Sequence, residues 1–177
     1  MTALQGFARI GFCSFRTIGG LALSVGLLTA SAGAARCQDQ SAATAADAIN
    51  ARKVVMDSID DHMNAIEGAV NSGQPIDLDV AHEHADTISA MLMAFPHLFP
   101  PSTNQWKPNV DRDPARDTYA SPDVWTNFAD FYKQATAASK SAFTASRAKN
   151  NADFIKAVAS LRLGCNSCHS AYLKTDQ

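Results

Sequence analysis

Two cysteines and a histidine lie within five residues near the C-terminus, in the run CNSCH that ends at His169. On a helix, Cys168 and His169 follow Cys165 by three and four residues, so the three side chains share one face and can converge on one object. Two thiols and an imidazole at this spacing can form a redox-active pair, contribute to a zinc site, or attach a haem.

The surrounding sequence separates these three chemistries. A thioredoxin-like redox pair lies where a strand leads into a helix, and no strand pattern occurs in this chain. A structural zinc site needs four ligands, but there is no second cysteine pair and the other histidines are far away in sequence. The pattern C-x-x-C-H is the recognised signature of c-type haem attachment. We therefore predict one haem c, with thioether bonds from Cys165 and Cys168 and with His169 as the proximal iron ligand.

Residues 1–34 have the pattern of a secretory signal peptide. Arg9 and Arg16 precede the apolar stretch IGGLALSVGLLTA, and the small residues of SAGAA follow it. The strongest apolar part covers only about Leu21 to Leu28, whereas roughly 20 apolar residues span a bilayer. Cleavage near Ala34 is therefore favoured over a membrane anchor. The mature protein is expected in the periplasm, with no membrane association.

Cysteine count and charge argue against two further classes of protein. Cleavage would remove Cys13 and leave an odd number of cysteines, so a disulfide framework is not expected. Cys37 follows Arg36, where bacterial lipidation requires a small residue, and we interpret it as a free thiol. The chain has 15 basic and 17 acidic residues and a formal net charge of -2. It lacks the basic patch of a nucleic-acid-binding protein, so no nucleic-acid partner is expected.

Beyond the leader, apolar residues recur every three or four positions in four segments, which predicts four amphipathic helices. The expected helix starts are Thr44, Asp77 or Asp79, Ser121 followed by Pro122, and Asn151, and the first two helices should end before Gly73 and at Pro96. The residues expected to face inward are Ile49, Met56, Ile59, Met63, Ile66 and Val70 in the first helix, Ala81, Ile88, Met91, Leu92 and Phe95 in the second, Val124, Trp125, Phe128, Phe131, Tyr132, Ala135, Ala138 and Ala142 in the third, and Phe154, Val158, Leu161, Cys165, Cys168 and Tyr172 in the fourth.

This pattern predicts an all-α fold, an antiparallel four-helix bundle with a covalently attached haem c. The bundle should cover residues 44–175, after a loose N-terminal segment at residues 35–43. The connection between the second and third helices is proline-rich and too long for an ordinary turn. We expect it to wrap the domain or to line a functional site.

The chain resembles the class II c-type cytochromes, which include the cytochromes c′. The resemblance covers roughly Ile49 to Lys174 and rests on three features: ARKVVM in the first helix, SPDVW at the start of the third, and CNSCHSAY in the last. It implies a four-helix bundle with the haem on the last helix, and it implies a homodimer as one expected assembly. The family usually has a basic residue after the aromatic of the motif, where this chain has Leu173.

Met56 is the expected distal iron ligand. In an antiparallel bundle the C-terminal end of the last helix lies beside the N-terminal half of the first, and Met63 would lie about 10 Å further along the axis. The resemblance implies the same ligand, since the low-spin branch of the family has a ligating methionine four residues after an arginine of the first helix. The alternative is that Met56 only fills the core, as methionine at helical spacing usually does.

Arg52 interrupts the apolar stripe of the first helix, where a core side chain is expected. An arginine one turn from the iron ligand can pair with a haem propionate through its planar guanidinium. The alternative is a solvated arginine near a frayed helix end.

The other histidines are not expected to bind the iron. His62 lies off the apolar stripe, and His97 lies in the proline-rich turn. His82 and His84, two residues apart, point to nearly opposite faces of a helix. None of them is assigned a ligand role.

A histidine and methionine pair keeps iron six-coordinate in both oxidation states, so an electron can be transferred with little rearrangement. The sequence has no phosphate-binding loop or nucleophile triad that would suggest an enzyme. We expect a one-electron carrier that exchanges electrons with a redox protein donor and acceptor. The alternatives are a five-coordinate cytochrome c′ that binds NO or CO, and a haem-bearing structural or sensory subunit of a larger complex.

Overall fold

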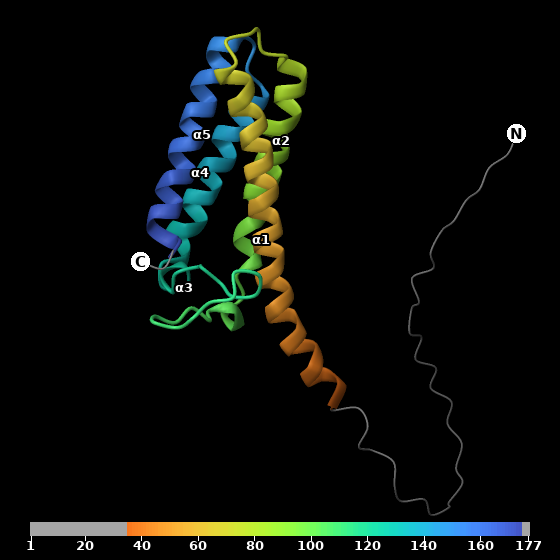
Figure 1. The fold of residues 1–177 in the computed structure, drawn as a ribbon, viewed down its shortest axis with the longest axis vertical. Helices are drawn as coiled ribbons and strands as arrows, with labels where there is room; N and C mark the ends of the chain where they lie inside the picture. Colours follow the sequence, from red (N-terminus) through yellow and green to blue (C-terminus); the bar gives the residue numbers. More distant parts are fainter. Residues whose placement is uncertain (1–34, 175–177) are drawn as a thin grey trace, which may run out of the picture.

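The computed structural model describes residues 35–174, which form the expected all-α bundle (Figure 1). Its helices are α1 Ala35–Asn71, α2 Leu78–Ala94, α3 Asp123–Thr126, α4 Phe128–Ser146 and α5 Asn151–Tyr172, with the short 3-10 helices η1 Phe95–Leu98 and η2 Pro101–Thr103 after α2. The predicted signal peptide, with Cys13, lies outside the described residues. Within the described part, no helix combines the length and hydropathy needed to cross a bilayer.

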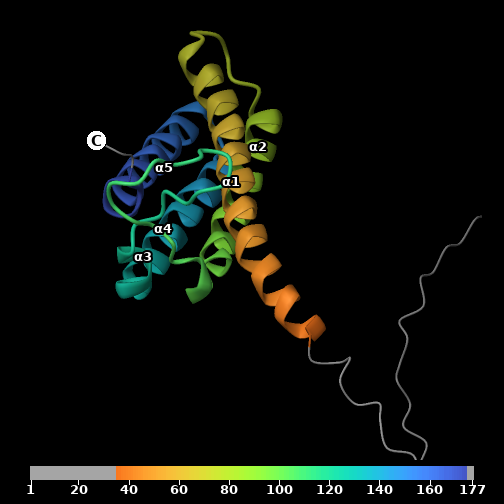
Figure 2. The ribbon, with the colours of Figure 1, turned by 60° about the horizontal axis from the view of Figure 1, so that its bottom comes forward.

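The four long helices pack side by side in the order α1, α2, α4, α5. α4 lies against both α2 and α5, whereas α1 and α5 barely touch. Figure 2 shows the α4–α5 pair diverging from α1 toward the end of the bundle that carries α3. The bundle therefore opens between α1 and α5, at the end where α5 finishes.

The first helix begins earlier than the sequence analysis predicts. α1 starts at Ala35 instead of Thr44, so residues 35–43, expected to be loose, are helical. This stretch contains no glycine or proline, and alanine and glutamine favour helix strongly enough to continue it through Thr44. The predicted end is confirmed, because α1 stops at Asn71 and Gly73 follows with φ +70°, a left-handed conformation that glycine adopts without steric cost.

One of the expected helix caps is present, and a second lies one residue earlier than predicted. The Asp77 carboxylate accepts hydrogen bonds from the backbone N–H groups of Asp79 and Val80, at 3.2 and 3.3 Å. α5 is capped by Asn150, one residue before the predicted Asn151. Asn150 accepts from the Asp153 N–H at 3.0 Å and donates its amide to the Asp153 carboxylate at 2.8 Å, a reciprocal pair that Asn151 could not form at the same spacing.

The predicted third helix is divided in two. Asn127 has φ -120° and ψ 37°, outside the helical region, and separates α3 from α4. The inward face of α4 is also narrower than predicted. Phe131 is buried as predicted, but Phe128 and Tyr132, also expected inside, are 39% and 37% exposed.

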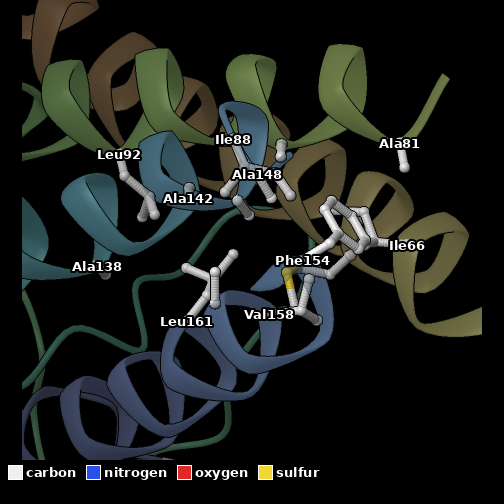
Figure 3. Packing of buried hydrophobic residues seen from close by; sticks show 14 of the residues in the cluster. Ile66, Ala81, Ile88, Leu92, Ala138, Ala142, Ala148, Phe154, Val158 and Leu161 are labelled. Atoms are coloured by element: carbon white, nitrogen blue, oxygen red, sulfur yellow. The ribbon is translucent and has the colours of Figure 1, made fainter. Parts of the chain in front are cut away.

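The main core lies at the end of the bundle away from α3 and includes residues of all four long helices. Figure 3 shows Ile88 of α2 and Phe154 and Leu161 of α5 pointing into the space between the helices. α4 contributes mainly alanines, such as Ala138 and Ala142, whose small side chains let α2 and α5 approach it closely.

A second, aromatic cluster fills the opposite end of the bundle. Its buried members are Phe95, Phe99, Val124, Phe131 and Tyr172. Edge-to-face contacts join its rings, which is a favourable geometry for aromatic pairs. The aromatic cluster holds η1, the following loop, α4 and the end of α5 together.

The long loop before α3 is attached to the end of α5. Ala120 and Leu173 form an isolated antiparallel bridge, and the Lys174 N–H donates to the Tyr119 carbonyl oxygen at 2.8 Å. These backbone bonds hold the loop across the open end of the bundle.

Candidate functional site

A cavity of about 510 Å³ lies between α1, α4, α5 and the loop before α3. This volume falls in the range of cofactor and small-molecule sites. The structure brings every predicted site residue to this cavity, whose lining includes Arg52, Met56, Cys165, Cys168 and His169. The loop that was expected to line a functional site lies on this cavity, to whose lining it contributes Pro114, Thr118, Tyr119 and Ala120.

The two cysteines and the histidine lie in the last two turns of α5. The helix is continuous to Tyr172, so Cys165, Cys168 and His169 share one face as the spacing predicts. Both cysteines are half-buried free thiols, and the His169 side chain is accessible.

The surroundings keep these three groups uncharged. Burial raises the pKa of Cys165, and it raises the pKa of Cys168 to about 11, with smaller contributions from Cys165 and Asp130. Desolvation by the surrounding protein, and then the charge of Arg162, lower the pKa of His169, although part of its side chain remains accessible. A raised thiol pKa is the opposite of what a redox-active cysteine pair requires, and a neutral imidazole keeps a ring nitrogen free to bind a metal.

Arg52 is a buried cation, only 5% exposed, so the alternative of a solvated surface arginine is wrong. Its guanidinium donates to Thr103 Oγ1 at 2.9 Å and to Thr118 Oγ1 at 3.0 Å, and lies 4.4 Å from the centre of the Phe99 ring. Burial lowers the pKa of Arg52 to about 10, which still leaves it charged at neutral pH.

No described acidic side chain forms an ion pair with Arg52, whose hydrogen bonds go to neutral hydroxyl groups. A buried charge without a counter-charge is costly, and proteins retain such a group where it meets an anion. Since Arg52 lines the cavity, the site fits a ligand that brings a negative group to this wall.

Thr103, Thr118 and Phe99 hold the Arg52 guanidinium in place, and sequence reasoning missed all three. They lie on η2, on the loop and beside η1, and the two threonines are 51 and 66 residues from Arg52 along the chain. No spacing rule connects residues at such separations, so only the path of the loop reveals them.

Met56 lies on the α1 wall, across the cavity from α5. It is half-buried and packs against both the main core and the aromatic cluster. Met63 also touches the cavity, but it is only 1% exposed and belongs to the main core, as the sequence analysis expects. Met56 is therefore the more accessible of the two thioethers.

Two polar contacts that sequence reasoning missed join the cavity walls. Arg162 of α5 forms a bidentate ion pair with Glu67 of α1, with N–O distances of 2.6 and 2.7 Å. The Tyr172 hydroxyl donates to Asp130 at 2.8 Å and ties the end of α5 to α4. Burial, followed by the Asp130 hydrogen bond, raises the pKa of Tyr172 to about 12. Arg162 lies seven residues before His169, a spacing that could have indicated its place on the same face of α5.

The site as a whole fits a haem c. It combines two adjacent thiols for thioether bonds, a neutral imidazole, a thioether on the opposite helix, aromatic and aliphatic walls, and a buried arginine without an anion. These are the groups needed for the porphyrin, the iron and a propionate.

Known proteins share both sequence and fold with this chain. The family model described as Cytochrome C' matches residues 47–173. A cytochrome c-556 of Agrobacterium tumefaciens (strain II Chrys) is 29% identical over 127 residues, which cover 70% of this chain and 94% of that protein. A cytochrome c′ of Pararhodospirillum photometricum is 30% identical over 125 residues, covering 68% and 91%.

Solved structures show the same fold. The cytochrome c′ of Thermochromatium tepidum superposes with a TM-score of 0.64 at 19% identity, covering 74% of this chain and 97% of that one. The cytochrome c′ of Rubrivivax gelatinosus gives 0.62 at 24% identity, covering 73% and 97%.

Proposed function

Because this chain belongs to the cytochrome c′ family, whose members carry a covalently attached haem c with iron, we propose that it is a periplasmic one-electron carrier with His169 and Met56 as axial ligands. The observation that supports this most directly is that both side chains line one cavity, from helices on its two sides. The carrier role belongs to the low-spin, six-coordinate branch of the family.

Cys165 and Cys168 would hold the haem by thioether bonds, and Arg52 would pair with a propionate. When bound, the haem supplies an iron that gains and loses one electron. His169 and Met56 belong to continuous helices, so both ligands can keep their positions in the two oxidation states. With His169 and Met56 as ligands the iron has no open position for a substrate, so the proposal includes no substrate chemistry and no enzymatic activity.

The proposal also includes export to the periplasm, redox protein partners and a homodimer. A signal peptide at residues 1–34, cleaved near Ala34, would deliver the chain to the periplasm, where haem attachment and electron exchange with donor and acceptor redox proteins take place. Mass spectrometry of the exported protein tests the cleavage site. A homodimer is part of the proposal, because one solved cytochrome c′ with a similar fold is described as having a ligand-controlled dimer dissociation.

A second candidate function is binding of NO or CO at a five-coordinate iron. Two observations favour it. Met56 packs against both clusters, as a residue that only fills space would do. The cytochrome c′ of Alcaligenes xylosoxidans, solved with bound NO, has a similar fold with a TM-score of 0.61 at 18% identity.

Optical spectra of the holoprotein, ferric and ferrous, with and without CO, distinguish the two functions. The carrier function predicts low-spin spectra that CO does not change. It also predicts that Met56→Leu, which conserves volume, gives a high-spin form that binds CO. Met63→Leu is the matched control, because it makes the same change on the same helix and should leave the spectra unaltered. Ready CO binding by the wild type, with no effect of Met56→Leu, would establish the gas-binding function instead.

A further inference from the structure

His62 of α1 and His84 of α2 face each other across the contact between these helices. Their Nδ1 atoms are 2.7 Å apart, and their ring centres are 5.0 Å apart at an interplanar angle of 58°. Both rings are half-buried, and neither lines the haem cavity. His82 points elsewhere, against Phe154, which agrees with the expectation that His82 and His84 face opposite ways.

In any combination of neutral tautomers, at least one ring nitrogen of the pair carries no proton and has no hydrogen-bond partner within the pair. A neutral imidazole has one N–H and one bare nitrogen, so at most one proton can lie between the two Nδ1 atoms in a hydrogen bond. The alternative occupant of that position is a cation that both bare nitrogens can bind. Two imidazole nitrogens bound to one ion at about 2.0–2.1 Å lie roughly 2.9 Å apart when the ligands are at right angles, and roughly 3.4 Å apart in the tetrahedral geometry that zinc prefers. The observed 2.7 Å is the separation of a hydrogen bond, so the two nitrogens must move apart by about 0.2–0.7 Å, and the rings must turn, to bind the same ion.

We propose that His62 and His84 form a binding site for a divalent transition-metal ion, separate from the haem iron. Imidazole nitrogen favours Zn²⁺, Cu²⁺ and Ni²⁺ over Mg²⁺ and Ca²⁺, which prefer oxygen ligands. Among the described residues, no group of three or more histidine, cysteine or acidic side chains is placed to hold a metal. The site is therefore a two-histidine site, with water in the remaining coordination positions.

The backbone on both sides of the pair is rigidly packed. Met63, next to His62, is 1% exposed, and Ala85, next to His84, is fully buried in the main core. The two rings are thus held close together before a metal arrives, so little conformational entropy is lost on binding. A bound ion would connect α1 to α2 and stabilise the folded state, because the unfolded chain does not hold the two rings together.

Titration of the holoprotein with Zn²⁺, followed by calorimetry, tests this site. Zinc is suitable because it has no redox chemistry with the haem. The expected result is one Zn²⁺ per chain, an affinity at least tenfold lower in His62→Gln and in His84→Gln, and a zinc-dependent rise in melting temperature that both variants lose. His97→Gln is the matched control, since His97 is exposed on η1 and contacts Tyr132 instead of another histidine.

Wild-type protein that takes up no zinc, or His62→Gln and His84→Gln variants that bind it as tightly as the wild type, would overturn the proposal. The haem absorption spectrum confirms that each variant is folded. Because the pair lies outside the cavity, zinc should leave that spectrum unchanged, so the zinc result and the Met56→Leu result are independent.

Discussion

The Arg52 guanidinium donates a hydrogen bond to Thr118 Oγ1 at 3.0 Å, which joins a buried charge on α1 to the loop that covers the open end of the bundle. Thr118 in turn accepts from the Ala120 N–H at 3.1 Å, next to the bridge between Ala120 and Leu173. The cation is therefore held by the same loop that is attached to the end of the haem-bearing helix.

We predict that Arg52→Leu lowers the reduction potential of the haem. A nearby positive charge disfavours the ferric state, which carries one more positive charge than the ferrous state, so its removal favours oxidation. A decrease of up to about 60 mV, or about 1.4 kcal/mol for one electron, is expected in a redox titration. Arg147→Leu is the control, because Arg147 is exposed and does not line the cavity. Equal potentials in Arg52→Leu and the wild type would show that Arg52 does not interact with the haem.

We predict that Thr118→Val destabilises the protein by about 1–3 kcal/mol. The change keeps the shape of the side chain but leaves a guanidinium N–H and the Ala120 N–H without their acceptor. Urea unfolding of the holoprotein measures the difference. Thr144→Val is the control, since the exposed Thr144 hydroxyl bonds only within α4, and its loss should cost less than about 0.5 kcal/mol. Equal costs for the two variants would contradict the role given to Thr118.

Glu67 should contribute stability that depends on pH. Its hydrogen bond with Arg162 lowers the pKa of Glu67, so the folded state binds a proton less readily than the unfolded state. The contribution is present above the unfolded pKa and is lost as pH falls through the lower folded pKa. Both side chains are partly exposed, so the wild type should exceed Glu67→Gln by only about 0.5–1 kcal/mol at pH 7.

Urea unfolding from pH 7 down through the acid range follows this difference, which should shrink as Glu67 is protonated. Asp86→Asn is the matched control, because Asp86 and Arg147 form a more exposed and longer ion pair, at 3.4 Å. A difference between the wild type and Glu67→Gln that does not vary with pH would rule out the ion pair as its cause.

The stability of the main core should depend strongly on the Phe154 side chain. This side chain is fully buried between α5 and the neighbouring helices, so Phe154→Ala removes apolar contacts and leaves a cavity. We expect a loss of about 3–5 kcal/mol in the free energy of unfolding. Phe143→Ala, at a half-exposed position on α4, should cost far less. Similar losses at both positions would mean that the main core is not centred where the structure places it.

Local features were predictable because their causes lie within a few residues. The shared face of Cys165, Cys168 and His169 follows from helical spacing alone. The C-terminal end of α1 follows from Gly73, and the start of α2 follows from the Asp77 cap. The break at Asn127 was missed, since a single non-helical residue leaves the apolar period on both sides almost unchanged. Phe128 and Tyr132 lie at the edges of the buried stripe of α4, and apolar spacing alone does not separate the edge of a stripe from its centre.

The sequence by itself therefore determined the four amphipathic segments, the haem-attachment motif and the interruption of the apolar stripe at Arg52, but not the start of α1 or the break at Asn127. Only the tertiary structure decided what each polar group meets: Thr103 and Thr118 beside Arg52, Glu67 beside Arg162 at a separation of 95 residues, and His62 beside His84. The physical reason is that helical periodicity fixes the direction of a side chain around its own axis. The partner it meets depends on how the helices are rotated and spaced against one another, which the packing of the whole core determines.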